Sequence, residues 1–197
     1  IKETNYKSTK DKIYQIIKIL YTEYEFLLQS DKLSQGDKLF FHKVIMGEMN
    51  EAETILAFYQ LSKFLYQYYG KKPIILLDEY DTPMQEAYVH GFWEELVYFI
   101  RNFFNATFKT NPYFERAVMT GITRVSKESI FSDLNNLKVV TITSDEYATS
   151  FGFTEEEVFE SLEIYGLEAE KEQVKYWYDG FKFGGYTDIY NPWSILN

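Results

Sequence analysis

Two adjacent carboxylates after a short apolar run offer the clearest chemistry in this sequence. The run Ile74–Leu77 is followed directly by Asp78 and Glu79. Continuous apolar runs of this length are typical of strands buried on both faces of a parallel sheet, and ligands of such sheets bind at the carboxyl ends of the strands. An Asp at that position can hold Mg²⁺ against nucleotide phosphates, and a Glu beside it can orient or deprotonate the attacking water. The pattern predicts a magnesium ligand at Asp78 and a general base at Glu79.

The same acids have a second interpretation, which concerns the helix that follows them. Thr82 is a candidate N-cap, Pro83 suits the first helical position, and Gln85 stands at the capping-box position. Asp78 and Asp81 would then only place negative charge near the amino end of a helix, where the macrodipole favours it. The pattern alone supports the two interpretations equally.

The elements that must position these acids alternate between helices and strands. Periodic apolar residues and helix-end signals predict helices at residues 9–28, 37–46, 51–69, 92–107, 154–165 and 168–178, and helices that begin at 82 and 192. Apolar runs predict strands at residues 73–77, 116–122 and 139–142, and residues 179–185 predict a turn or small hairpin. This alternation indicates the α/β class, with a parallel sheet and flanking helices in residues 1–143 and a small helical, lid-like subdomain in residues 144–197.

Composition argues against several kinds of site. The net charge of −10 disfavours a broad nucleic-acid-binding surface, and the absence of cysteine removes disulfides, thiolate catalysis and zinc–thiolate sites. Histidine chemistry would have to use His42 or His90, whose helix-like, aromatic surroundings favour packing or surface roles. Every apolar run is far shorter than the roughly 20 residues of a membrane span. We expect a cytoplasmic protein without a membrane segment and without direct nucleic-acid binding by this part.

Five blocks of the sequence, in order, resemble the bacterial AAA-ATPase-like family, in which a PD-(D/E)xK-type nuclease domain often follows. The blocks are residues 73–83, 119–137, 151–158, 177–181 and 190–194. The resemblance implies an incomplete P-loop NTPase-type sheet, ATP and Mg²⁺ as cofactors, and Asp78-Glu79 as the Walker B element. It also implies that Thr120, at the end of the next strand, senses the γ-phosphate. Arg124 follows closely enough to reach a γ-phosphate or a neighbouring subunit, although an ion pair with a nearby acid is the favoured alternative.

One part of the family pattern is missing from these residues. The sequence contains no G-x-x-x-x-G-K-[ST] phosphate-binding loop. We therefore expect the loop to lie upstream of Ile1, any nuclease-like domain to lie downstream of Asn197, and this chain alone to be inactive. In the usual strand order the missing first strand would lie between the strands at 116–122 and 139–142. We expect either exposed apolar surface there or a non-native pairing of those two strands.

The leading hypothesis is therefore ATP binding and hydrolysis by the parent protein. The alternative is a non-enzymatic interaction module that nucleotide merely switches, or that binds none. A metal-dependent nuclease built on Asp78, Glu79 and Asp81 is disfavoured, because no Lys lies nearby and the chain is acidic. An upstream Gly-Lys-Thr or Gly-Lys-Ser would favour the ATPase.

Overall fold

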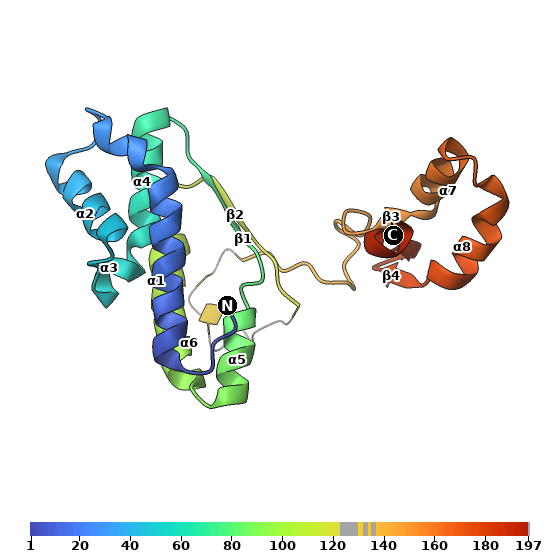
Figure 1. The fold of residues 1–197 in the computed structure, drawn as a ribbon, viewed down its shortest axis with the longest axis horizontal. Coiled ribbons are helices and arrows are strands. Elements are labelled where there is room, and N and C mark those ends of the chain that lie inside the picture. Colours follow the sequence, from blue (N-terminus) through green and yellow to red (C-terminus); the bar gives the residue numbers. More distant parts are fainter. Residues whose placement is uncertain (123–129, 132–133, 135–136, 197) are drawn as a thin grey trace. The chain divides into compact units, whose positions relative to one another are not determined.

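The computed structural model describes residues 1–122, 130–131, 134 and 137–196, and the chain divides into two compact units. The first unit spans Ile1–Leu137 and the second spans Lys138–Asn197. Figure 1 shows the elements of each. In the part of the chain that the structure describes, no helix is long and apolar enough to cross a lipid bilayer.

The first unit begins with helices whose ends follow local sequence signals. These elements are α1 (Tyr6–Glu23), the 3₁₀ helix η1 (Glu25–Gln29), α2 (Gln35–Met46), α3 (Glu51–Ile55) and α4 (Ala57–Tyr69). Asn50 and Glu53 form the predicted capping box at the start of α3. Gly47 and Gly70 have positive φ angles of 76° and 67° at the ends of α2 and α4, where only a residue without Cβ is unstrained. The ends predicted at Gly47 and Gly70 and the cap predicted at Asn50 are confirmed, whereas α1 and α2 begin at residues 6 and 35, before the starts predicted at residues 9 and 37.

Two of the predicted helices are interrupted. The helix predicted for residues 9–28 ends at Glu23 and continues as η1, because the N–H of Tyr24 bonds to the carbonyl of Tyr21 at 3.0 Å. The helix predicted for residues 51–69 is divided at Leu56, whose N–H bonds to the carbonyl of Glu53 at 3.2 Å. In both places the backbone hydrogen bond joins residues three apart in the sequence and not four apart, which is the 3₁₀ pattern.

The sheet of the first unit has two parallel strands, β1 (Ile74–Leu77) and β2 (Arg116–Met119). The prediction that the first strand is buried on both faces is wrong. Ile74 and Leu76 are 55% and 76% exposed, and Val118, which pairs with Leu76, is 49% exposed. The helices of this unit lie on one side of the strands in Figure 1. The other face is an exposed apolar surface, which differs from the gap beside residues 116–122 where we expected one, and the described residues of this unit form a mixed α/β structure.

The strand predicted for residues 139–142 does not form, so its pairing with residues 116–122 does not form either. The N–H of Ser144 bonds to the carbonyl of Thr141 at 2.9 Å, and the N–H of Thr141 bonds to the Ser144 hydroxyl at 3.1 Å. These local bonds close a turn and satisfy backbone groups that a strand would have offered to a neighbour.

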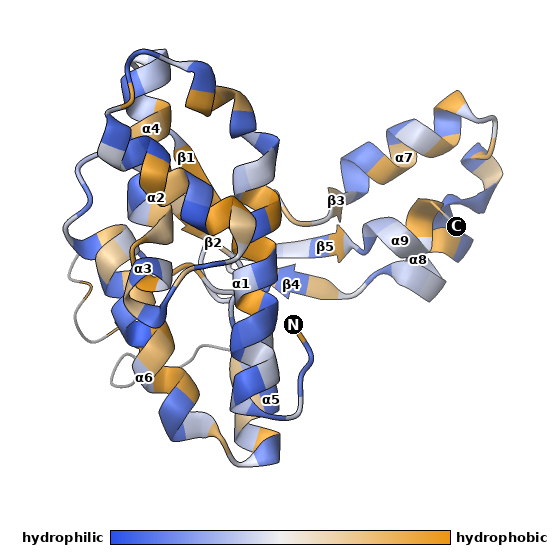
Figure 2. Cartoon of the chain, turned by 60° about the vertical axis from the view of Figure 1, so that its left-hand side comes forward, coloured by the Kyte–Doolittle hydropathy of each residue, from blue (hydrophilic) through white to orange (hydrophobic). Residues whose placement is uncertain are grey.

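Two helices between β1 and β2 supply much of the core, α5 (Thr82–His90) and α6 (Trp93–Phe104), and a π-helical turn, η2 (Asn105–Lys109), follows. The predicted N-cap at Thr82 is wrong by one residue, because Asp81 occupies that position and Thr82 is already helical. Figure 2 shows hydrophobic segments along α4, α6 and β1. The aromatic rings of Phe99, Phe103 and Phe104 on α6 are buried, which explains how an aromatic-rich sequence forms this core.

The second unit contains more strand than we expected of a helical subdomain. Its elements are β3 (Phe153–Thr154), α7 (Glu155–Ile164), the 3₁₀ helix η4 (Glu168–Glu170), α8 (Lys171–Tyr178), β4 (Phe181–Phe183), β5 (Tyr186–Tyr190) and α9 (Pro192–Leu196). The strands form an antiparallel sheet in the order β3-β5-β4. The predicted hairpin is present as β4 and β5, and the Thr154–Glu157 capping box of α7 is confirmed.

Candidate functional site

The parallel register of β1 and β2 brings Asp78 and Thr120 together. Leu77 pairs with Met119, so the residue that follows each strand lies at the same edge of the sheet. The pairing continues past the strand ends, because Thr120 donates its N–H to the carbonyl of Leu77 at 3.0 Å. Tyr80 in turn donates its N–H to the carbonyl of Thr120 at 3.1 Å. The predicted placement of carboxylate and hydroxyl at one sheet edge is therefore fixed by backbone bonds.

One carboxylate oxygen is the centre of the polar contacts at this edge. The Thr120 hydroxyl donates to Oδ1 of Asp78. The N–H of Glu79 lies 3.0 Å from the same oxygen and 3.4 Å from Oγ1 of Thr120. Asp78 and Glu79 are both exposed, and Thr120 is half-buried. The second oxygen of Asp78 and both oxygens of Glu79 can therefore face an incoming ligand or water.

Glu79 has an uncommon backbone conformation. Its φ angle is 50°, in the left-handed region that favours glycine. Such a residue costs on the order of 1–3 kcal/mol, and residues of this kind cluster at functional sites, where neighbouring contacts maintain them. Tyr147 and Asp188 of the second unit also have positive φ angles, of 61° and 59°. At Glu79 the contacts are the bonds of Tyr80 and Glu79 to Thr120. The strain supports a functional interpretation of this turn.

The helix-start interpretation of the acids is less well supported by the geometry. The Asp78 side chain bonds Thr120 and Glu79, not the first turn of α5. Asp81 holds the N-cap position without a side-chain capping bond, and it accepts a hydrogen bond from the Gln85 side chain at 3.0 Å. Asp81 is only 1% exposed, so its carboxylate is separated from solvent, unlike those of Asp78 and Glu79. The three acids do not form a common exposed cluster of the kind a nuclease would need.

The donors at this edge suit a metal that receives most of its ligands from elsewhere. Among the described residues no group of three or more His, Asp or Glu side chains could hold a metal ion. Mg²⁺ commonly keeps several waters and is bound by one or two carboxylates together with substrate phosphates. An exposed carboxylate such as Asp78 fits that kind of site.

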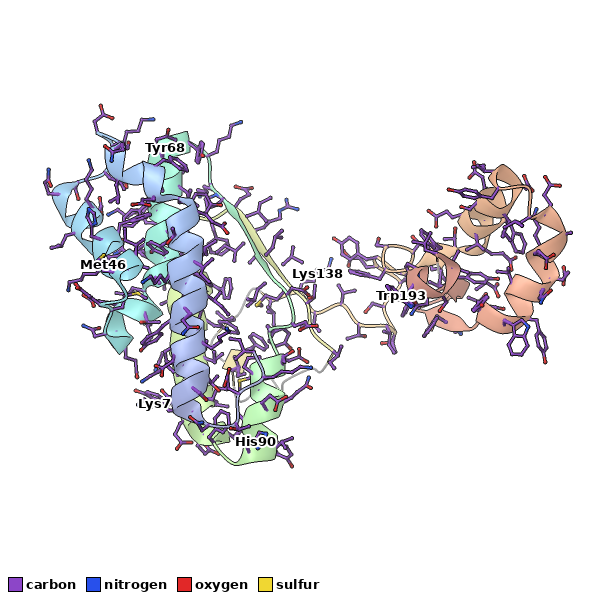
Figure 3. The ribbon with its side chains drawn as sticks, viewed as in Figure 1. Lys7, Met46, Tyr68, His90, Lys138 and Trp193 are labelled. Carbon is purple, nitrogen blue, oxygen red and sulfur yellow. The ribbon has the colours of Figure 1, made fainter. Side chains whose placement is uncertain are left out.

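The remaining predicted residues have different outcomes. Arg124 lies outside the described residues. His90 lies at the far end of α5 from Asp81, where its Nε2 is 3.4 Å from a carboxylate oxygen of Glu86 (Figure 3). Sequence reasoning missed the burial of Asp81 and the close packing of Gly121 described below. In the sequence, the available indication was proximity to a site residue, because Asp81 follows Glu79 by two residues and Gly121 directly follows Thr120.

Comparison with known proteins gives a family match and one distant relative. The model of the AAA-ATPase-like family, described as a predicted AAA-ATPase, matches residues 1–131, which is more than half of the chain. A protein of Azotobacter chroococcum mcd 1, described as an uncharacterized protein in the vnfD 5′ region, is 29% identical over 130 residues. That match covers 64% of this chain and 24% of the relative, so the chain spans about a quarter of the relative's length. No solved structure matches.

Proposed function

The chain belongs to the AAA-ATPase-like family, and from this premise we propose that it supplies the metal-binding and water-activating edge of an ATP-hydrolysing site. The observation that carries the proposal is the meeting of Asp78, Glu79 and Thr120 at the carboxyl ends of two parallel strands. This is the place where ligands of open α/β sheets bind.

Each of the three residues has a separate role in the proposal. Asp78 binds Mg²⁺, directly or through water, with the free oxygen that Thr120 and Glu79 leave available. Glu79 is exposed and accepts a proton from the attacking water or orients it. Thr120, whose hydroxyl donates to Oδ1 of Asp78 in this structure, would turn that one donor to a γ-phosphate oxygen when nucleotide binds. When bound, Mg²⁺ would neutralise charge that develops on the phosphates.

The other parts of the site belong to the proposal as well. The phosphate-binding loop would lie in a longer protein, upstream of these residues, and a nuclease-like domain could follow them. Arg124, which follows β2 in the sequence, is proposed to reach a γ-phosphate or a neighbouring subunit, and an ion pair with a nearby acid is the favoured alternative. ATP is the proposed nucleotide and the cytoplasm the proposed compartment.

The test separates the two exposed carboxylates in a protein that carries the upstream loop. Asp78→Asn should weaken magnesium-dependent nucleotide binding and turnover together, because it removes the metal ligand. Glu79→Gln keeps the shape and should leave nucleotide binding near normal while turnover falls about a hundredfold or more, the range for losing a general base. Nucleotide affinity and single-turnover hydrolysis are measured on the same preparations.

Glu94→Gln is the matched control, because Glu94 is an exposed glutamate on α6 of the same unit. It should leave both quantities unchanged. If Glu79→Gln turns over as fast as the unmodified protein at saturating Mg-ATP, Glu79 is not the base. Binding without any hydrolysis in the unmodified protein would favour the nucleotide-switched module instead.

A further inference from the structure

The turn behind the two exposed carboxylates passes so close to Gly121 that no side chain fits there. A Cβ atom added to Gly121 would lie 2.7 Å from Oδ1 of Asp81 and 2.8 Å from Cε1 of Tyr80. It would also lie 3.0 Å from Cγ of Asp81. The φ angle of Gly121 is outside the left-handed region, so this position needs glycine for space and not for its backbone freedom.

The two side chains that lie against Gly121, those of Asp81 and Tyr80, are each fixed by a further contact. Asp81 is 1% exposed, and its Oδ2 accepts a bond from the Gln85 side chain at 3.0 Å. The ring of Tyr80 packs edge-on against Phe131, with centroids 5.4 Å apart. Phe131 itself stacks on Phe104 in the core at 5.9 Å. Neither the Asp81 carboxylate nor the Tyr80 ring can retreat without disturbing buried groups.

The close packing acts on the peptide that carries Thr120. Gly121 follows Thr120 directly, and the Thr120 carbonyl accepts the N–H of Tyr80 while its own N–H donates to Leu77. We infer that Gly121 and Asp81 are positioning residues, which set how closely the two strand ends approach and thereby hold the Thr120 hydroxyl on Asp78. Gly121 follows Thr120 in the chain and lies against the side chains of Asp81 and Tyr80, so the two residues act through Thr120 and not by contact with substrate. The catalytic consequence rests on the proposed function, whereas the packing itself does not.

Hydrogen exchange tests the packing without any nucleotide. In the full chain, Gly121→Ala should make the amides of Thr120 and Tyr80 exchange about tenfold faster, a loss typical of an overpacked contact. Amides of α6 should keep their protection. Gly36→Ala is the matched control, because its added Cβ would meet nothing closer than Oγ of Ser34 at 3.8 Å. Unchanged protection at Thr120 and Tyr80 in Gly121→Ala would overturn the inference.

Asp81→Ala keeps the inference testable if Gly121→Ala fails to fold. This variant removes the carboxylate that meets Gly121, and it should also make the amides of Thr120 and Tyr80 exchange faster. If Asp81 and Gly121 act through one contact, the double variant Gly121→Ala/Asp81→Ala should lose no more protection than the worse single variant. Strictly additive losses would contradict a shared contact.

Turnover gives the second readout, in a protein that carries the upstream loop. Gly121→Ala should lower kcat about tenfold with a much smaller change in KM, because a displaced Thr120 affects the reacting phosphate more than nucleotide binding. If the unmodified protein does not hydrolyse Mg-ATP at all, the proposed function fails while the exchange result still decides the packing. If it does, and Gly121→Ala changes neither rate nor exchange, only the positioning inference fails.

Discussion

The surroundings of Tyr190, in the second unit, raise the pKa of its side chain. Its ring is buried, and its hydroxyl lies 3.4 Å from Oε2 of Glu155. Burial first, and then the negative charges of Asp179 and Glu155, raise the pKa of Tyr190 to about 12, while Lys175 acts in the opposite direction. A tyrosine in an unfolded chain has a pKa of about 10.

This difference in pKa predicts how stability changes at alkaline pH. The folded second unit favours the neutral phenol, so Tyr190 destabilises the fold as pH rises from about 10 toward 12, and it has no such effect below that range. Unfolding by denaturant at several pH values, followed in the unmodified chain and in Tyr190→Phe, measures the effect. Tyr190→Phe should lose less stability over this range, and identical pH dependence of the two would contradict the assignment.

Residue types at the site could be predicted from the sequence, but their surroundings could not. Asp78 and Glu79 follow an apolar strand, and this order supported a ligand site at the sheet edge as much as a role at the start of the next helix. The φ angle of Glu79 and the burial of Asp81 depend on how β2 approaches from a distant part of the chain. The need for glycine at position 121 likewise depends on atoms of Tyr80 and Asp81, which are not its neighbours in sequence.

At the scale of elements, local signals predicted some helix ends correctly, and they predicted strand surroundings poorly. Asn50 with Glu53, and Gly70, act on backbone groups within a few residues, so their effect can be read locally. The apolar run of β1 carries no mark that distinguishes a covered face from an exposed one. At residues 139–142 the Ser144 hydroxyl and the backbone N–H and carbonyl of Thr141 form a turn where apolar neighbours had indicated a strand.

The two faces of β1 give a direct test with one residue type. Leu77 packs against the core, whereas the next leucine, Leu76, is 76% exposed. Leu77→Ala should lower the free energy of unfolding by about 1–2 kcal/mol, less than the value for a fully buried leucine because Leu77 is only half-buried. Leu76→Ala should stay within about 0.5 kcal/mol, as surface substitutions do. Equal losses in urea denaturation would show that both faces are covered in solution.

At the scale of the whole molecule, the family match and the first unit largely coincide. The match covers residues 1–131, and the first unit covers Ile1–Leu137. The proposed ATPase residues therefore all lie in this unit or, for Arg124, in its sequence range. These residues stand on a sheet of two parallel strands, which agrees with the predicted α/β class but is too small to show the expected order of further strands.

The absence of a phosphate-binding loop motif from the 197 residues leads to a prediction for the isolated chain. Backbone amides and a lysine of such a loop normally hold the β- and γ-phosphates, and Asp78 and Glu79 would repel those phosphates without Mg²⁺. Calorimetric titration with Mg-ATP should show no saturable binding in the micromolar range. A clear one-site isotherm would place the nucleotide elsewhere than we propose.

The left-handed backbone at Glu79 implies a trade-off between robustness and activity. Asn adopts this conformation more readily than Glu, so Glu79→Asn should raise the thermal midpoint of the chain while removing the proposed base. Selection for thermal tolerance alone would then drive this position away from glutamate. A lowered midpoint in Glu79→Asn would show that the carboxylate itself supports the turn. If the midpoint rises, the glutamate is retained at the expense of the fold, as expected of a residue kept for its chemistry.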